Sequence, residues 1–482
     1  MNQSLTNETE LLSEALERLQ GEFSALPHYT PDVPGESGMA AVLAEAAQRM
    51  GDNYPYFHPL YAGQMLKPPH PIARAAYALA MNLNPNNHAL DGGRASSRME
   101  WEAVREIAAM FGWTEFIGHL TGGGTVSNLE GLWVAGQMAP GKTVVASEQA
   151  HYVHERMSSV LKLPFRSIRC DRWGRMDLDN LEAELATGDV GTVVATLGTT
   201  GAGAVDPLDA ILNLRTKYGI RIHVDAAYGG YFCLASNLDN DTQRAFDCIG
   251  EADSIVTDPH KHGLQPYGCG CILFRDPGMG RWYKHDSPCT YFTSKELHIH
   301  GGAGHEPGPA CEGPTFAAEL FQQGSLHLGE ICLECSRAGA SAVALWATQR
   351  LLPLVRGGEF AHGLEQGREA ALRLHSIIAS DPRFVPGPLP QLDIVNWVVR
   401  AQTVAESSQR AHQVFDQAAA KLDLHLALAD MPTRIFPGAE WSDSNDSTNV
   451  TCLRSVLMKP EHLSWVDEIG KRLRQATDGI LP

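Results

Sequence analysis

Five short, almost continuously apolar runs constrain the fold of this chain more than any other feature. Most are separated by enough residues to form a helix, and they are Thr143–Ala146, Thr192–Leu197, Arg221–Val224, Ser254–Thr257 and Gly270–Phe274. Strands that are buried on both faces of a mainly parallel sheet have this pattern, because helices cover each face. The sequence therefore predicts an α/β fold built on a mainly parallel sheet.

The chain has 482 residues, more than one simple core needs, so we expect more than one domain. Residues 1–73 predict an arm with an amphipathic helix at its start and an irregular, proline-rich and aromatic-rich remainder. Residues 74–350 contain the apolar runs and predict a large domain, and residues 351–482 predict a smaller α/β domain. Residues 294–328, rich in glycine, proline and histidine, predict a mobile excursion from the large domain.

The charge and the N-terminus exclude several classes of protein. With 38 Lys and Arg against 56 Asp and Glu, the net charge of −18 argues against binding to nucleic acid or to an anionic membrane. Residues 1–20 lack the basic start and apolar core of a signal peptide, and no apolar run approaches the roughly 20 residues of a membrane helix. We therefore expect a cytoplasmic protein with reduced cysteines.

Two groups of possible metal ligands do not predict a metal site. Cys332 and Cys335 have the spacing of half a zinc site or of a redox pair, but no second pair accompanies them. His298, His300 and His305 lie in a glycine-rich setting that provides no fixed ligand geometry. We interpret the cysteines as structural and expect no bound metal.

Polar residues follow the apolar runs at the edge of the sheet where ligands collect. Asp225 ends one run, and Lys261 follows the next with Asp258 and His260 beside it. Such a lysine can form an imine with an aldehyde cofactor, and such a carboxylate can pair with a ring nitrogen that must stay protonated. The sequence therefore predicts pyridoxal 5'-phosphate (PLP) as the cofactor. Considered alone, Asp225 could instead cap a turn, and Lys261 could be a solvated loop lysine.

A glycine-rich segment supplies a candidate phosphate site. Residues 120–128, with sequence LTGGGTVSN, precede a predicted helix over Leu129–Met138. Glycines let the backbone curl around an anion, and the N–H groups at a helix start can hold a phosphate, although a plain turn with a helix cap has the same composition. His151 follows another strand end, from which its imidazole could stack on an aromatic ring.

With these motifs in place, the chain resembles the group II PLP-dependent amino-acid decarboxylases, which include aromatic amino acid, tyrosine, glutamate and histidine decarboxylases. The resemblance extends from about Tyr54 to the C-terminus and is strong toward the bacterial tyrosine decarboxylase branch. The motifs that carry it are Asn84–Asn87, Gly118–Val126, Gly131–Ala135, His223–Gly230, Asp258–Lys261 and Ser336–Ala340.

The resemblance implies a fold-type I enzyme with a seven-stranded large domain and a small C-terminal domain. It further implies that the N-terminal arm forms a homodimer with the active sites at the subunit interface. Lys261 is the implied attachment point of PLP, with His151 stacked on the ring, Asp225 at the ring nitrogen and Ala227 beneath the ring. The remaining implied cofactor contacts are Gly124, Thr125, Thr200, Asp258 and His260.

The resemblance also implies a substrate pocket and a proton donor. His88 and Leu90 match positions that reach the substrate, usually from the partner subunit. A tyrosine on a loop after the lysine usually returns the proton to the α-carbon. Tyr291 lies at a fitting distance along the chain, with Tyr267 and Tyr283 as competitors.

The leading interpretation is removal of the α-carboxylate of an L-amino acid, with an aromatic one such as tyrosine favoured. Arg94 and Arg98 near the expected pocket could instead bind glutamate or aspartate. The motifs also allow oxygen-dependent conversion of the amino acid to an aldehyde, or a carbon–carbon lyase reaction on the same scaffold. A non-catalytic family member that binds partners or stores PLP is a further alternative. Substrate identity stays open because Val126 replaces a frequent glutamate and Gln64 replaces the histidine expected in tyrosine decarboxylases.

Overall fold

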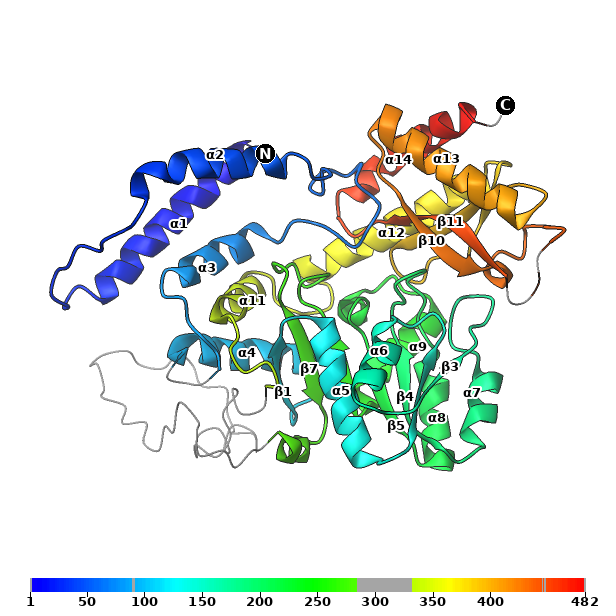
Figure 1. Cartoon of the computed structure of the whole chain (residues 1–482), viewed down its shortest axis with the longest axis horizontal. Helices are drawn as coiled ribbons and strands as arrows, with labels where there is room; N and C mark the ends of the chain where they lie inside the picture. Colours follow the sequence, from blue (N-terminus) through cyan, green and yellow to red (C-terminus); the bar gives the residue numbers. More distant parts are fainter. Residues whose placement is uncertain (1, 89–91, 284–331, 444, 446–447, 481–482) are drawn as a thin grey trace.

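The computed structural model of the chain describes residues 2–88, 92–283, 332–443, 445 and 448–480 (Figure 1). Three subjects of the sequence predictions lie outside these residues: Leu90, Tyr291 and the excursion over residues 294–328. No helix in the described ranges has the length and the apolar character to cross a membrane.

A seven-stranded sheet forms the centre of the molecule, with the strand order β1-β7-β6-β5-β4-β2-β3. β7 runs antiparallel to both of its neighbours, and the other neighbouring pairs are parallel. The strands are β1 Ile117–Thr121, β2 Thr143–Ser147, β3 Phe165–Ile168, β4 Val190–Thr196, β5 Arg221–Asp225, β6 Ser254–Thr257 and β7 Gly270–Phe274. The predicted mainly parallel seven-stranded sheet is confirmed.

The five predicted apolar runs coincide with β2, β4, β5, β6 and β7 to within two residues at either end. All residues of β4, β6 and β7 are buried, which explains why these runs lack polar alternation. β1 and β3 were not among the predicted strands. β1 contains Gly118 and His119, and β3 is an edge strand with three residues that are not fully buried.

Helices pack against this sheet and against one another. α5 contacts β5, β6 and β7, α4 contacts β1, and α11 packs against both α3 and α4. The helices of this part of the chain are α3 Pro71–Met81, α4 Arg94–Met110, α5 Gly124–Met138, α6 Val153–Val160, α7 Leu178–Leu185, α8 Leu208–Tyr218, α9 Asn240–Asp247 and α11 Gly339–Leu351.

A second, antiparallel sheet has the order β10-β11-β9-β8 and belongs to the C-terminal part of the chain. Its strands are β8 Phe384–Pro386, β9 Ile394–Val399, β10 Ala427–Pro432 and β11 Asn449–Val456. Three helices accompany it, and they are α12 Glu359–Ala379, α13 Val404–Leu422 and α14 His462–Asp478. Trp397, Leu453 and Val466 are fully buried in the core between this sheet and its helices.

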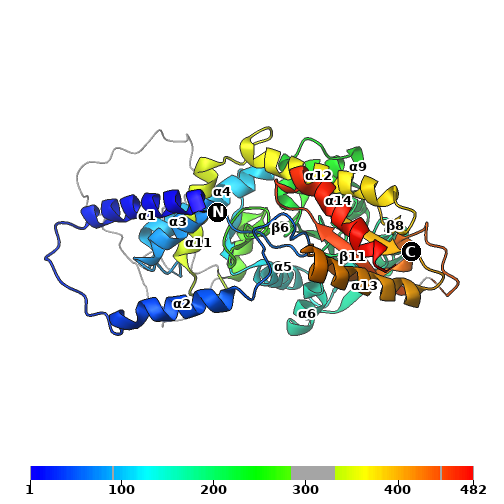
Figure 2. The ribbon, with the colours of Figure 1, turned by 90° about the horizontal axis from the view of Figure 1, so that it is seen from above.

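The N-terminal helices α1 Asn2–Glu22 and α2 Met39–Met50 extend from one side of the molecule (Figures 1 and 2). α1 contains the predicted amphipathic helix and contacts α3. The prediction that the remainder of the arm is irregular was wrong over α2. Its sequence, MAAVLAEAAQRM, consists mostly of strong helix formers, and the prolines and glycines on either side of it obscured that signal.

Candidate active site

One cavity of about 290 Å³ lies at the carboxyl ends of the parallel strands. The loops after β1, β2, β4, β5 and β6 all contribute to its lining, because the carboxyl ends of these strands meet at one edge of the sheet. Every residue predicted to contact the cofactor lines this cavity, and these are Gly124, Thr125, His151, Thr200, Asp225, Ala227, Asp258, His260 and Lys261.

Lys261 reaches the cavity from the turn that follows β6. Its Nζ lies 3.0 Å from Oδ2 of Asp258, and the Lys261 side chain is 22% exposed. His260 contributes a second nitrogen 3.5 Å from the same carboxylate oxygen. The turn is tight, because a Cβ on Gly263 would lie 2.5 Å from Cα of Pro259. The ammonium is therefore held at the cavity wall by a nearby negative charge.

Asp225 is the last residue of β5 and is almost fully buried. Its Oδ1 accepts a hydrogen bond from the backbone N–H of Ala227 at 3.1 Å, and its Oδ2 lies 2.8 Å from Nε2 of His154. Burial by itself raises the pKa of Asp225, but the contact with His154, the nearby Lys261 ammonium and the N–H of Ala227 together outweigh burial and hold that pKa below its usual range. The carboxylate is therefore ionised and oriented.

His151 lines the cavity immediately before α6. Its Nδ1 accepts a hydrogen bond from the backbone N–H of Val153 at 3.2 Å, which fixes the orientation of the ring. Burial lowers the pKa of His151, and the nearby Asp225 only partly opposes this effect. A neutral imidazole can lie against an aromatic ring without adding a positive charge beside it.

The glycine-rich segment forms a cradle at the start of α5. Gly123 has φ of +147°, in the region that favours glycine, and a Cβ on Gly124 would lie 2.7 Å from Oδ2 of Asp258. α5 begins at Gly124, so the positive end of its dipole faces the cavity. Close backbone approach and a helix start are the features that suit a phosphate group.

The cavity residues fit PLP by the chemistry of their donor set. A lysine can bind the aldehyde, an ionised aspartate can hold the ring-nitrogen proton, and the glycine cradle can hold the phosphate. Oδ1 of Asp258 is buried and has no hydrogen-bond partner among the described residues. An unpartnered buried acceptor of this kind favours a donor from a bound group.

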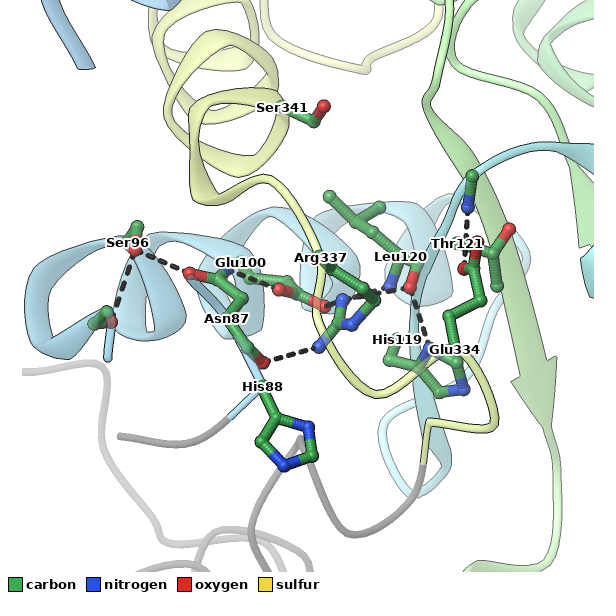
Figure 3. A network of polar contacts seen from close by, with 12 residues as sticks. Asn87, His88, Ser96, Glu100, His119, Leu120, Thr121, Glu334, Arg337 and Ser341 are labelled. Atoms are coloured by element: carbon green, nitrogen blue, oxygen red, sulfur yellow. Dashed lines mark hydrogen bonds and ion pairs between the residues drawn. The ribbon is translucent and has the colours of Figure 1, made fainter. Parts of the chain in front are cut away.

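A buried polar network supports the loop that carries His88 (Figure 3). Nη1 of Arg337 donates to Oε1 of Glu100 at 2.5 Å and to the carbonyl oxygen of Leu120 at 2.9 Å. Nη2 of Arg337 donates to the carbonyl oxygen of Asn87 at 3.0 Å, and Nδ2 of Asn87 donates to Oε2 of Glu100 at 2.6 Å. The network joins the His88 loop to the end of β1, directly before the glycine cradle.

Arg454 on β11 was missed by the sequence predictions. It is 3% exposed, and its Nε donates to the carbonyl oxygen of Gly201, which is next to the cavity residue Thr200. Nη1 donates to Oε1 of Gln64 at 3.0 Å, and Nη2 has no hydrogen-bond partner among the described residues. In the sequence, Arg454 lies within an apolar strand pattern and far along the chain from the other site residues, so no local signal marks it.

His154 was also missed, although its spacing of three residues from His151 was a signal. His151 lies just before α6 and His154 in its first turn, and the backbone N–H of His154 donates to the carbonyl oxygen of His151 at 3.2 Å, so this turn keeps the two residues close. Here the first reaches the cavity and the second reaches Asp225 behind it.

Other predicted residues lie away from the cavity. Tyr283 is buried and donates to Oε2 of Glu130 at 2.9 Å, whereas Tyr267 is exposed and donates to the carbonyl oxygen of Met65. Arg94 and Arg98 are exposed on α4, and neither lines the cavity. Of the two candidate proton donors that the structure describes, Tyr267 lies beside a cavity residue, with its ring centroid 4.9 Å from that of His260.

Among the described residues, one group of three possible metal ligands, His119, Glu130 and Cys332, has ligand atoms within 4.8 Å of one another. Nε2 of His119 is already 2.7 Å from Oε2 of Glu130. Burial by itself lowers the pKa of His119, but the carboxylate of Glu130 raises it well above its usual value. The pair therefore forms a buried charged contact that joins β1 to α5.

The comparisons with known proteins agree with a PLP site in this cavity. A model of the pyridoxal-dependent decarboxylase conserved domain matches residues 132–279. A probable L-tyrosine/L-aspartate decarboxylase of Methanoregula boonei is 30% identical over 298 residues, which cover 61% of this chain and 78% of the relative. The chain belongs to the PLP-dependent amino-acid decarboxylase family. The predicted family and the predicted cofactor are confirmed.

Further similarities extend over most of this decarboxylase family member. The L-tyrosine decarboxylase of Enterococcus faecium is 28% identical over 480 residues, which cover 77% of this chain and 74% of the relative. The crystal structure of Oryza sativa TDC with PLP and tryptamine has a TM-score of 0.74 and 17% identity, and covers 100% of this chain and 98% of that chain. Together with the sheet order, this structural likeness confirms the predicted fold type I.

Proposed function

We propose that this family member removes the α-carboxylate of an L-amino acid to give an amine and CO2, with an aromatic substrate such as tyrosine favoured. The observation that carries the proposal is the convergence of Lys261, Asp225 and His151 on one cavity beside a glycine cradle. The names of the tyrosine decarboxylase relatives support the aromatic preference.

Each of these residues has a distinct task in the proposed reaction. PLP, when bound, supplies an electron sink through its protonated ring. Lys261 holds the aldehyde, the ionised Asp225 keeps the proton on the ring nitrogen, and the neutral His151 lies against the ring. The backbone at Gly124 and Thr125 holds the phosphate. The further predicted contacts of Thr200, Ala227, Asp258 and His260 are part of the same proposal.

We assign Arg454 to the substrate carboxylate. Its buried guanidinium lies beside Gly201, and its Nη2 can donate a further hydrogen bond. A guanidinium binds a carboxylate strongly, because charge and hydrogen bonding act together. A carboxylate fixed in this way has a defined orientation relative to the cofactor ring, which the departure of CO2 requires.

The proton donor and the substrate pocket remain proposals from the resemblance. We propose that Tyr291 returns the proton to the α-carbon and that His88 and Leu90 contact the substrate. The network of Glu100 and Arg337 holds the loop before His88 in place, which supports a positioning role for that loop.

An acidic substrate is the second candidate, and two observations favour it. Relatives are named L-tyrosine/L-aspartate decarboxylases, and the buried Arg454 could bind a side-chain carboxylate. Initial rates of amine release from tyrosine, phenylalanine, tryptophan, aspartate, glutamate and cysteine sulfinate decide between the two. Turnover of the acidic members alone would contradict the aromatic preference.

We further propose a cytoplasmic homodimer with active sites at the subunit interface. The eight cysteines among the described residues are free, as a reducing compartment favours. The arm helices extend from the molecule (Figure 2). The arm exposes several large apolar side chains, among them Leu26, Val42, Leu43 and Met50. A second copy of the chain would cover these side chains, so V42K/L43K should shift the mass in light scattering from dimer to monomer.

The central experiment uses purified protein with excess PLP. We expect cofactor absorbance, a borohydride-trapped adduct on Lys261, and amine and CO2 in equal amounts. K261A should abolish the adduct and the activity together, whereas K217A, at an exposed lysine on α8, should retain both. Activity that survives K261A would disprove the assigned nucleophile. Ammonia and peroxide formed in step with CO2 would indicate aldehyde formation instead.

A further inference from the structure

We propose that His154 is a positioning residue, which holds Asp225 ionised and oriented toward the ring nitrogen of PLP. The inference rests on the proposed function, because it assigns a task to the residue behind the carboxylate rather than to the carboxylate itself.

The geometry places His154 directly behind the cavity wall. It lies in the first turn of α6, is fully buried, and does not line the cavity, whereas Asp225 does. Its Nε2 is 2.8 Å from Oδ2 of Asp225, and the backbone N–H of Ala227 donates to the other oxygen at 3.1 Å. One donor on each oxygen fixes the plane of the carboxylate and leaves lone pairs for a donor on the cavity side.

The surroundings of His154 identify Nε2 as the nitrogen whose N–H donates to Asp225. Nδ1 of His154 is buried and has no hydrogen-bond partner among the described residues. A proton on Nδ1 would therefore be buried without an acceptor, which is unfavourable. The ring of His223, with its centroid 6.5 Å from that of His154, has a pKa lowered to about 3 by burial and so adds no positive charge beside this pair.

The hydrogen bond from His154 orients the Asp225 carboxylate from the side away from the cavity. Without His154, Oδ2 of Asp225 would be buried without a donor, which favours the protonated acid and weakens its hold on the ring-nitrogen proton.

Three substitutions and one control separate this role from simple packing. H154L removes the donor at similar volume, H154Q places an amide N–H near the position of Nε2, and H154N keeps a polar group too short to reach Asp225. S158A is the control, because Ser158 is buried one turn later on the same helix and its hydroxyl has no hydrogen-bond partner among the described residues. The melting temperature of each apoprotein reports whether the variant is folded.

The readouts are the dissociation constant of PLP, the 15N chemical shift of ring-labelled PLP in the holoprotein, and kcat and KM for the best amino acid. We expect H154L and H154N to weaken PLP binding and lower kcat by about 10-fold to 100-fold, as the loss of one hydrogen bond to a charged group predicts. KM should change by less than about 3-fold, because the substrate contacts are intact. The 15N shift should move toward that of an unprotonated ring, and H154Q should recover most of each value.

Two results would overturn the inference: an unchanged 15N shift and PLP affinity in folded H154L or H154N, or a loss in H154Q as large as in H154L. If H154L does not fold, the comparison of H154N with H154Q decides the matter. Wild-type protein that binds no PLP would instead refute the proposed function, so the two failures are distinguishable.

Discussion

At the scale of single residues, several buried polar atoms near the cavity are without a hydrogen-bond partner among the described residues. They include Oδ1 of Asp258, in the cavity wall, and Nη2 of Arg454. Buried polar atoms nearly always have partners, so such exceptions in or beside a cavity favour a ligand. Asp225 differs, because both of its oxygens accept hydrogen bonds from the protein. Its task is to present charge in a fixed direction.

Substitution of Arg454 tests the proposed carboxylate contact. R454M should raise KM for the amino acid by about 10-fold to 100-fold, the loss expected for one charge-assisted hydrogen bond, with a smaller effect on PLP affinity. Steady-state kinetics and a PLP titration measure the two effects. R373M, at a half-exposed arginine on α12, is the control and should behave as wild type. A PLP affinity that falls as much as the substrate affinity would contradict the assignment.

The sequence predicts site residues where position along a strand decides their place. Asp225 and Lys261 could be identified because each follows an apolar run, and the ends of parallel strands meet at one edge. His154 and Arg454 could not, because their roles depend on contacts with residues from distant segments. His154 reaches a strand 71 positions away, and Arg454 reaches Gln64 from a separate sheet.

At the scale of elements, the ion pair between Glu100 on α4 and Arg337 before α11 joins several segments. Both side chains are almost fully buried, and the guanidinium also holds the backbone at Leu120 and Asn87. Removal of one partner of a buried pair leaves an uncompensated charge, which is far more destabilising than the loss of an exposed pair.

We therefore expect R337M to lower stability by about 3–5 kcal/mol. R337M/E100Q should recover part of this loss, because no buried charge then lacks a partner. The apoprotein melting temperatures of the single and double variants measure both effects. R350M is the matched control: Arg350 on α11 pairs with Glu102 on α4, but their side chains are 52% and 40% exposed, so the cost should stay below about 1 kcal/mol. Equal losses in R337M and R350M would contradict the buried-pair argument.

The sequence predicts strands better where all residues are buried. β4, β6 and β7 are buried throughout, so their apolar pattern is visible without tertiary information. β1 cannot be recognised in this way, because its identity as a strand depends on pairing with β7. At Gly118 the two strands approach so closely that a Cβ would lie 2.4 Å from the carbonyl oxygen of Ile272. Only close approach between the two strands explains that glycine.

At the scale of the whole molecule, Asp393 joins the two sheets. It precedes β9 of the small sheet, and its Oδ1 accepts a hydrogen bond at 2.5 Å from Tyr228, which lines the cavity after β5. His262, next to Lys261, lies 3.3 Å from the other oxygen. The orientation of the small sheet is thus coupled to residues of the cavity wall.

This contact predicts a pH dependence of stability. Burial raises the pKa of Asp393 to about 6, although the hydrogen bond from Tyr228 opposes the increase. From about pH 4 to 6 the folded protein therefore binds more protons at this site than the unfolded chain does. The contribution of Asp393 to the free energy of unfolding falls over this interval, by about 3 kcal/mol in total, and is constant above it.

D393N should lack this decrease while it keeps an acceptor for Tyr228. Melting temperatures of both proteins from about pH 4.5 to 7, at fixed protein and PLP concentrations, give the difference between them as a function of pH. The advantage of D393N over wild type should grow with pH up to about 6 and then level off. A difference that does not vary with pH would contradict the raised pKa.

The lysine segment is anchored at both ends, where it leaves the sheet after β6 and returns at Gly270, which pairs with Thr121 just before the glycine cradle. A tether held in this way has few conformations to lose when an aldehyde becomes attached to it. The affinity for the aldehyde is then higher, because a preorganised lysine loses less conformational entropy when the aldehyde binds to it. The antiparallel β7, the exception in an otherwise parallel sheet, is the strand that closes this loop.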